Sequence, residues 1–367
     1  MAFSTPVRKL QPLLDDATAV QRGNVSNYGA SIMNLPAQIQ HAWLTARALR
    51  LPAAYRRATV AVACGMGGSS LGTDILRTVF RRELRRPLVL RNDYTLPGFV
   101  GPKTLLLASS YSGSTEEVLA ALGAARRRRA KIAVVSGGGP LASAAQRLRL
   151  PIFRFTPTHN PSGQPRLGLG YLLVGQWRLL GQANVVPETA KLMATFQAAV
   201  TAATARFSPT VPTRRNPAKR LALSIYGRVP LIITAELLAG NAHAFANQCH
   251  ESAKHLALTF SLPELNHHLL EGISLPAATR SLIGVLLASP SDPPRIQQRL
   301  RITRTVLQRQ HLPTFSYRAR PDSPIAQAGE ILQLGACASW YLAVLNRVNP
   351  QAIPWVDFFK AQLARSR

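Results

Sequence analysis

Residues 59–80 read TVAVACGMGGSSLGTDILRTVF. The first six residues form a short run of β-branched and small apolar side chains, which is typical of a buried strand. A glycine-rich stretch, GMGGSS, follows directly, and the residues after it have the pattern of a helix. The segment therefore predicts one strand–turn–helix unit whose glycines lie where the chain turns.

The same alternation continues through the first half of the chain. Strand-like apolar runs alternate with helical stretches at residues 87–92, 104–110, 112–126, 131–136, 140–148 and 152–155. Consecutive βα units of this kind predict a mainly parallel sheet that is covered by helices.

A second alternating series occupies the other half. Two apolar runs lead into a long helix through Cys249 to His255, and the series continues to the end of the chain, at residues 222–227, 231–234, 281–289, 296–308, 314–319, 325–345 and 353–365. We therefore expect an α/β protein with two doubly wound lobes, each a mainly parallel sheet flanked by helices.

Four segments are expected along the chain. Residues 1–55 form a helical N-terminal extension, residues 56–206 the first lobe, and residues 221–367 the second lobe with the C-terminal helices. Residues 207–220 are rich in proline and basic side chains and have no apolar periodicity, which favours a linker.

Length and composition agree with this organisation. A chain of 367 residues with 47% apolar side chains can bury two cores. Its longest apolar stretches are too short or too interrupted to supply the ~20 residues of a membrane span. The N-terminus lacks the pattern of a secretory signal, and Asp15 and Asp16 interrupt it early. We expect a cytoplasmic protein with no membrane span.

The cysteines and the net charge exclude some classes of protein. The three cysteines are odd in number and far apart, so neither a disulfide framework nor a clustered zinc motif is expected: Cys64, Cys249 and Cys337. The net charge is +28, and only seven of the 44 basic residues are lysines. Arginine runs near residues 81–86 and 126–129 could attract nucleic acid, but they fall at the ends of predicted helices, where cations favour the helix dipole. Because no nucleic-acid-binding signature accompanies the charge, such binding is not expected.

The glycine-rich turn after the first strand carries the first candidate site. Gly67 and Gly68 let the backbone approach a ligand, and Ser69 lies where a helix start offers free amide donors. A phosphate or sugar oxygen, a dinucleotide and simple tight packing all fit such a turn, although the dinucleotide G-x-G-x-x-G spacing is absent.

A second turn narrows these possibilities. Residues 109–117, SSYSGSTEE, carry five serine or threonine hydroxyls in seven residues between a strand and a helix. One such residue is enough to cap the helix, so five indicate a ligand such as phosphate, held by neutral donors and backbone amides.

Further polar residues lie among apolar ones. Arg166, in the motif QPR, precedes a mainly apolar helical stretch, and either reaches an anion or is one more surface arginine. The segment 249–272 is dense in titratable groups, including Glu251, Lys254 and His267. A histidine that acts together with a glutamate from another position in the sequence suits proton transfer. Zinc is the rival, but HExxH and CxxC spacings are absent, so no metal site is expected.

Six motifs in order, GMGGSSLG, SSYSGSTEE, QPR, HESAK, PELNHH and NPQAIPWVDFFK, resemble the bifunctional phosphoglucose/phosphomannose isomerases of the sugar isomerase (SIS) superfamily. They span residues from about 60 to 360. Three motifs depart from the family pattern: N-E-N-A-K is residues 250–254 here, P-E-L-N-H-N-E continues after His267 as His268 and Leu269, and the late D-P-T-P-V is residues 349–353, with Gln351 in place of Thr.

The resemblance implies two SIS lobes and a sugar 6-phosphate substrate. The family's phosphate-binding residues fall on Ser110, Ser112 and Thr115. Gly67, Gly68 and Ser69 then lie close to the sugar.

The resemblance also implies a mechanism without cofactor or metal. Glu251 moves a proton between C1 and C2 of a cis-enediol intermediate, and Arg166 stabilises its charge. Lys360 assists ring opening together with His267, which the family supplies from the partner subunit of a homodimer. A non-catalytic SIS protein that only binds or senses phosphosugars is the alternative.

Overall fold

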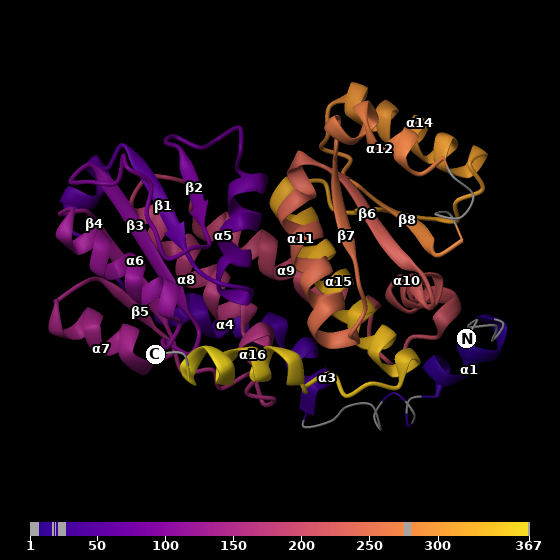
Figure 1. Cartoon of the computed structure of the whole chain (residues 1–367), viewed down its shortest axis with the longest axis horizontal. Helices are drawn as coiled ribbons and strands as arrows, with labels where there is room; N and C mark the ends of the chain where they lie inside the picture. The colour runs from indigo at the N-terminus through magenta and orange to yellow at the C-terminus, as the bar shows by residue number, and fades with distance from the viewer. Residues whose placement is uncertain (1–6, 17, 19, 21–26, 275–279, 366–367) are drawn as a thin grey trace.

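The computed structural model describes residues 7–365 except 17, 19, 21–26 and 275–279. Within these residues the chain forms two separate parallel sheets with helices on their faces, which confirms the predicted fold class (Figure 1).

The first lobe contains a five-stranded sheet in the order β2-β1-β3-β4-β5. Alternate residues of its strands face two cores, because Ala61 and Ala63 of β1 pack with α5 and α8, whereas Val62 and Cys64 pack with α6 and α7. Its elements are β1 (Val60–Cys64), α5 (Gly68–Val79), β2 (Leu88–Arg91), β3 (Thr104–Ser110), α6 (Glu116–Arg127), β4 (Lys131–Ser136), α7 (Gly139–Arg147), β5 (Ile152–Arg154), η3 (Pro165–Leu167), α8 (Leu169–Gln182) and α9 (Ala190–Arg206).

The second lobe contains a four-stranded sheet in the order β7-β6-β8-β9. The helix α15 is long and apolar enough to cross a membrane, but 94% of its apolar window is buried inside the molecule, so it is a core helix. The elements of this lobe are α10 (Pro217–Ile225), β6 (Val229–Ala235), η5 (Glu236–Leu238), α11 (Ala239–Ala253), β7 (Leu258–Leu262), η6 (Glu264–His267), α12 (Leu269–Gly272), β8 (Leu282–Ala288), α14 (Pro294–Arg309), β9 (Thr314–Arg318), α15 (Pro324–Asn346) and α16 (Pro354–Arg365).

The N-terminal extension is helical where it is described, with α1 (Val7–Asp15), α3 (Tyr28–Met33), α4 (Leu35–Ala46) and η2 (Ala53–Arg57). It belongs to both lobes, because α4 packs on α8 and α9 while α1 packs on α10 and α15. Residues 1–6, 17, 19 and 21–26 of the predicted extension lie outside the described residues.

The predicted linker and the start of the second series need correction. Residues 217–220 are the first turn of α10, which also takes in most of the apolar run 222–227. The reason is a helix start that composition concealed: the Asn216 side chain accepts hydrogen bonds from the amides of Ala218 (3.0 Å) and Lys219 (3.2 Å), and Pro217 occupies the first helical position. A strand that was not predicted, β7, occupies residues 258–262.

The contact between α5 and α11 brings the two lobes together. Gly240, at the start of α11, lies against Asp74 of α5, where a Cβ would be 2.7 Å from the Asp74 backbone. Its amide also donates to the Thr78 hydroxyl (3.4 Å), near the end of α5. The start of α11 therefore lies beside the later part of α5, so the end of α11 returns toward the start of α5.

Candidate functional site

The hydroxyls of the turn between β3 and α6 form two hydrogen-bonded groups. The buried Ser110 hydroxyl lies 2.7 Å from that of Thr115 and accepts from the Gly113 amide at 3.0 Å. The exposed Ser112 and Ser114 hydroxyls lie 2.9 Å apart. Gly113 has φ +74°, and a Cβ there would lie 1.8 Å from the Gly138 carbonyl oxygen, so only glycine fits.

The glycine-rich turn lies beside the hydroxyl-rich turn, because β1 and β3 are neighbouring parallel strands. The Ser69 hydroxyl accepts from the Tyr111 amide at 3.1 Å and so joins the two turns. Gly67 has φ +49° and open space where a Cβ would be, and it precedes the first residue of α5, Gly68. The structure thus brings together the residues predicted to hold phosphate and sugar.

Arg166 lies over the glycine-rich turn, where its Cα is 3.3 Å from the position of a Cβ on Gly68. Its side chain is only 8% exposed and is held from several segments. The guanidinium donates to the Gln164 side-chain oxygen (2.9 Å) and to the backbone carbonyls of Pro350 (2.8 Å) and Gln351 (2.7 Å). A buried cation fixed in this way is already positioned to stabilise a developing negative charge.

Glu251 reaches the same place from the second lobe. It lies near the end of α11, and its carboxylate is 3.8 Å from the Arg166 guanidinium. Burial raises the pKa of Glu251, and the charges of Arg166 and Lys254 oppose this shift without cancelling it. A raised pKa makes the carboxylate a better base near neutral pH.

Lys254 is a neighbour that was not predicted to be a site residue. It caps α11 in the left-handed conformation (φ +52°), and its ammonium contacts the Glu251 backbone carbonyl. Burial and the charge of Arg166 lower the pKa of Lys254 to about 8. Its motif, HESAK, was the available signal.

Tyr28 is a residue of the site that was not predicted from the sequence. This residue of α3 is fully buried, and its hydroxyl lies 2.6 Å from that of Ser252 and accepts from Arg166 Nε at 3.3 Å. Its ring also faces the Arg166 guanidinium, 5.6 Å from the ring centroid. The N-terminal extension therefore holds the arginine and contacts the helix that bears Glu251.

His267 does not join this group within one chain. It follows β7, whose end pairs with the end of β6, where α11 is about to begin. Glu251 is twelve residues further along α11, which corresponds to about 18 Å of helix. The exposed His267 therefore lies toward the opposite end of the second lobe from Glu251.

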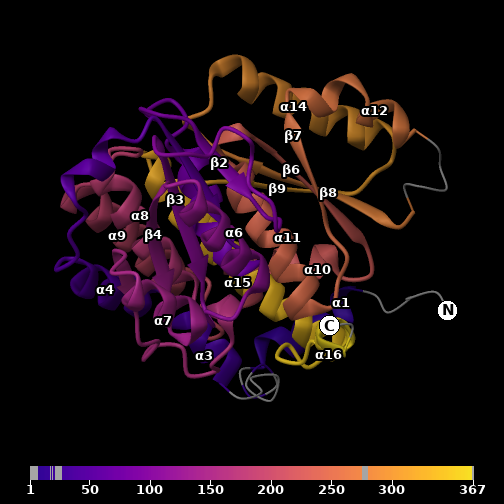
Figure 2. The same cartoon turned by 60° about the vertical axis from the view of Figure 1, so that its left-hand side comes forward.

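Lys360 lies on α16, and its positive charge partly opposes the burial that raises the pKa of Glu251. All described residues of α16 are exposed, including Trp355 at 82% and Phe359 at 63%. Figures 1 and 2 show this helix on the outside of the molecule.

The described residues hold no group of three His, Cys, Asp or Glu side chains placed to share a metal ion. The histidines near Glu251 form hydrogen bonds with backbone carbonyls. His250 bonds to the carbonyl of Ala257 (2.9 Å), and His255 bonds to the carbonyl of Arg228 (2.7 Å).

One family model, several curated proteins and several solved structures are similar to this chain. The model of the bacterial phospho-glucose isomerase C-terminal SIS domain matches residues 214–363. A bifunctional phosphoglucose/phosphomannose isomerase of Caldicellulosiruptor bescii is 30% identical over 91% of this chain and 98% of its own. One from Aquifex aeolicus is 28% identical over 83% of this chain and 90% of its own.

A solved structure of a hypothetical protein from Thermus thermophilus has a TM-score of 0.74 at 19% identity, covering 98% of this chain and 96% of its own. A glucose-6-phosphate isomerase from Chlamydia trachomatis has a TM-score of 0.69 at 12% identity, covering 98% of this chain and 85% of its own. These likenesses concern the fold.

Two parallel α/β lobes, with a hydroxyl-rich turn in one and a carboxylate from the other meeting at a buried arginine, define a double-lobed protein of the SIS class. The chain belongs, more particularly, to the family of bifunctional phosphoglucose/phosphomannose isomerases.

Proposed function

We propose that this protein interconverts glucose 6-phosphate, and also mannose 6-phosphate, with fructose 6-phosphate. The observation that carries the proposal is the 3.8 Å approach of the Glu251 carboxylate to the Arg166 guanidinium above the glycine-rich turn. A base next to a fixed cation is what moving a proton through an enediolate requires.

The reaction follows from these positions. Ser110, Ser112, Thr115 and the amides at the start of α6 bind the 6-phosphate. After ring opening, Glu251 removes the proton from C2 of the aldose, and electrons from the C–H bond form the C1–C2 double bond of a cis-enediol. Arg166 stabilises the negative charge on oxygen. The C1 oxygen then takes up a proton while the C2 hydroxyl gives one up, so that C2 becomes the carbonyl carbon. Glu251 returns its proton to C1, which gives the ketose with no net gain or loss of atoms or electrons.

Purified protein assayed with the three sugar phosphates tests the proposal. Turnover of glucose 6-phosphate or mannose 6-phosphate to fructose 6-phosphate without added metal is expected. Tight binding of these sugars with no turnover by the folded protein would instead establish the non-catalytic alternative.

We also propose a homodimer in which the partner subunit supplies His267. Two observations support this: His267 is exposed and lies toward the far end of its own lobe, and α16 exposes a large apolar surface. A twelve-residue helix with no packed face is marginal in water, so α16 gains most of its stability when a second copy covers it. A cytoplasmic location stays part of the proposal.

Mixing two inactive variants tests the shared site. Glu251→Gln and His267→Ala are each inactive alone, but a heterodimer of the two contains one site with both native residues if His267 crosses the interface. Random exchange then restores about a quarter of the wild-type activity. No recovery, with dimers shown by light scattering, would place His267 and Glu251 of one chain in the same site.

A further inference from the structure

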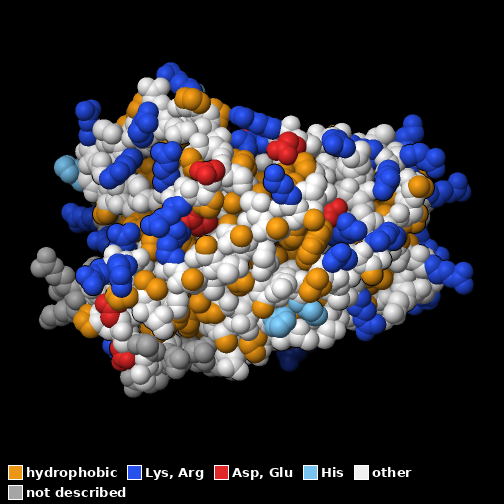
Figure 3. Space-filling view, turned by 180° about the vertical axis from the view of Figure 1, so that it is seen from behind, with side chains coloured by type: hydrophobic (Ala, Val, Ile, Leu, Met, Phe, Trp, Pro, Cys, Tyr) orange, Lys and Arg blue, Asp and Glu red, His pale blue; other side chains and the backbone are white. Residues whose placement is uncertain are grey.

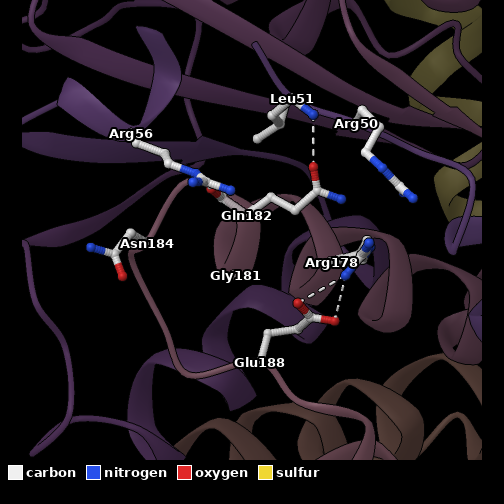
Figure 4. A pocket seen from close by; sticks show the side chains of 8 residues that line it. All are labelled: Arg50, Leu51, Arg56, Arg178, Gly181, Gln182, Asn184 and Glu188. Atoms are coloured by element: carbon white, nitrogen blue, oxygen red, sulfur yellow. Dashed lines mark hydrogen bonds and ion pairs between the residues drawn. The ribbon is translucent and has the colours of Figure 1, made fainter. Parts of the chain in front are cut away.

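A pocket lies on the first lobe, away from the hydroxyl-rich turn. It has a volume of about 530 Å³ and lies where α8 ends and where the chain enters β1 (Figure 4). We call it the arginine pocket, and it is lined by Arg50, Leu51, Arg56, Arg178, Gly181, Gln182, Asn184 and Glu188. Because the phosphate-binding turn follows the opposite ends of the parallel strands β1 and β3, the two sites are distinct.

Positive charge converges on the pocket from separate segments. Arg50 follows α4, Arg56 belongs to η2, and Arg178 lies on α8, and Figure 4 shows their side chains around Gln182. Two more arginines border it: Arg85 donates to the Asn184 side-chain oxygen at 2.5 Å, and Arg86 to the Ala183 carbonyl at 2.8 Å.

Negative charge does not balance this group. Arg178 forms a two-pronged ion pair with Glu188, at 2.8 and 2.9 Å. Among the described residues, no ion pair joins Arg50, Arg56, Arg85 or Arg86 to a carboxylate. Each guanidinium has five N–H groups, so most of these donors are not used by the protein.

Helix capping explains only part of the cluster. Arg56 donates to the Gln182 carbonyl (3.3 Å) and Arg86 to that of Ala183, and both bonds satisfy the end of α8. Arg50 instead donates to carbonyls of its own segment, Arg47 and Leu49. Basic side chains are distributed over the face of the molecule that Figure 3 shows, whereas five arginines lie in or beside this one pocket.

We propose that the arginine pocket binds an anion with two or more linked phosphate groups, such as inorganic pyrophosphate or triphosphate or the phosphate chain of a nucleoside triphosphate. Planar guanidinium groups match phosphate oxygens in pairs, and the side-chain amide of Asn184 adds a neutral donor. The volume exceeds what one phosphate fills. None of the lining residues is aromatic, so the pocket recognises the phosphate chain and not a base.

Calorimetric titration of the full chain with phosphate, pyrophosphate, triphosphate and ATP tests this. We expect triphosphate and ATP to bind alike and at least ~10-fold more tightly than phosphate. Arg50→Gln/Arg56→Gln should weaken triphosphate at least ~10-fold, whereas the matched pair Arg47→Gln/Arg57→Gln, which removes the same charge from the same segments outside the pocket, should change it less than ~3-fold.

Other outcomes overturn the proposal. Equal weakening by both double variants would mean general attraction to a basic surface, and so would RNA binding that both variants weaken equally. ATP that binds far more tightly than triphosphate would mean that a base is recognised.

The melting temperature of each variant checks folding, and the exposed Arg50→Gln alone replaces the double variant if that does not fold. Ser110→Ala should leave triphosphate binding unchanged, so the result is independent of the isomerase proposal.

Discussion

The two lobes repeat one topology, but the turns that follow their corresponding strands differ. In the first lobe the turn from β3 to α6 presents the exposed hydroxyls of Ser112 and Ser114 and the amides at a helix start. In the second, the turn from β8 to α14 is filled: the Ser289 hydroxyl donates to the Gln327 side-chain oxygen (2.5 Å), and the Gln327 amide donates to Ser291 (2.8 Å).

The second turn is also chemically unsuited to phosphate. Pro293 and Pro294 remove two amide donors at the start of α14. Asp292 is only 6% exposed there, and burial raises its pKa to about 6. A carboxylate in this turn repels a phosphate. We therefore assign substrate binding to the turn of the first lobe and a structural role to the turn of the second lobe, whose proposed catalytic residue Glu251 lies at the opposite end of α11.

Replacing Glu251, the proposed base from the second lobe, should have the largest effect on kcat. Glu251→Gln keeps the shape and the neighbours of the side chain but cannot accept the proton, so kcat should fall about 10³-fold or more while sugar-phosphate affinity stays within a few-fold. Steady-state kinetics and calorimetry measure the two quantities. A variant that keeps a tenth of the wild-type kcat would assign the proton transfer to another residue.

Matched serine substitutions in the two turns should separate their roles. Ser110→Ala removes a hydroxyl that we assign to the phosphate and should raise KM about 10- to 100-fold, as expected for a hydrogen bond to a charged group. Ser289→Ala removes a buried hydrogen bond in the second turn and should cost about 1 kcal/mol of stability with KM unchanged.

Denaturant unfolding and initial rates on both variants decide the comparison. A rise in KM for Ser289→Ala equal to that for Ser110→Ala would mean that the second turn also contacts substrate.

The pH dependence of kcat/KM should reflect the titration of Lys254, which lies at the end of α11. The ammonium of Lys254 is charged below its pKa of about 8 and neutral above it, so positive charge beside Glu251 and Arg166 is lost as pH rises through 8. We expect kcat/KM to fall several-fold across this range. Lys254→Arg keeps the charge and should move the decline to higher pH, whereas an unchanged profile would exclude Lys254 as its cause.

Much of this arrangement could be predicted from the sequence, because it rests on local patterns. The βα alternation, the hydroxyls of residues 109–115 and the motif containing Glu251 are continuous stretches. Three features were not predictable in this way. Asn216 starts a helix through its side chain inside a proline-rich stretch. The strand β7 is mostly exposed at a sheet edge and lacks a buried pattern. Tyr28 meets Arg166 across 138 positions, and no local pattern encodes that contact.

The smallest effect is expected for Tyr28, which links the N-terminal extension to Arg166 of the first lobe and to Ser252 of the second. Tyr28→Phe keeps the ring against Arg166 but removes the hydroxyl between Arg166 Nε and Ser252. Arg166 retains its bonds to Gln164 and to the carbonyls near residue 350, so it should shift rather than detach. We expect kcat to fall about 3- to 10-fold with KM little changed, since a hydrogen bond of this kind contributes about 1 kcal/mol.

Tyr55→Phe is the matched control, because its hydroxyl also donates a hydrogen bond, to the Ile132 carbonyl at 2.9 Å, near the start of β4 and far from Glu251. Both variants should lose similar stability, so a fall in kcat that is confined to Tyr28→Phe would come from the position of Arg166. Equal kcat for the two variants would leave Tyr28 with a purely structural role. In that case the bonds to Gln164, Pro350 and Gln351 would be enough to hold the arginine, and the extension would only cover the site.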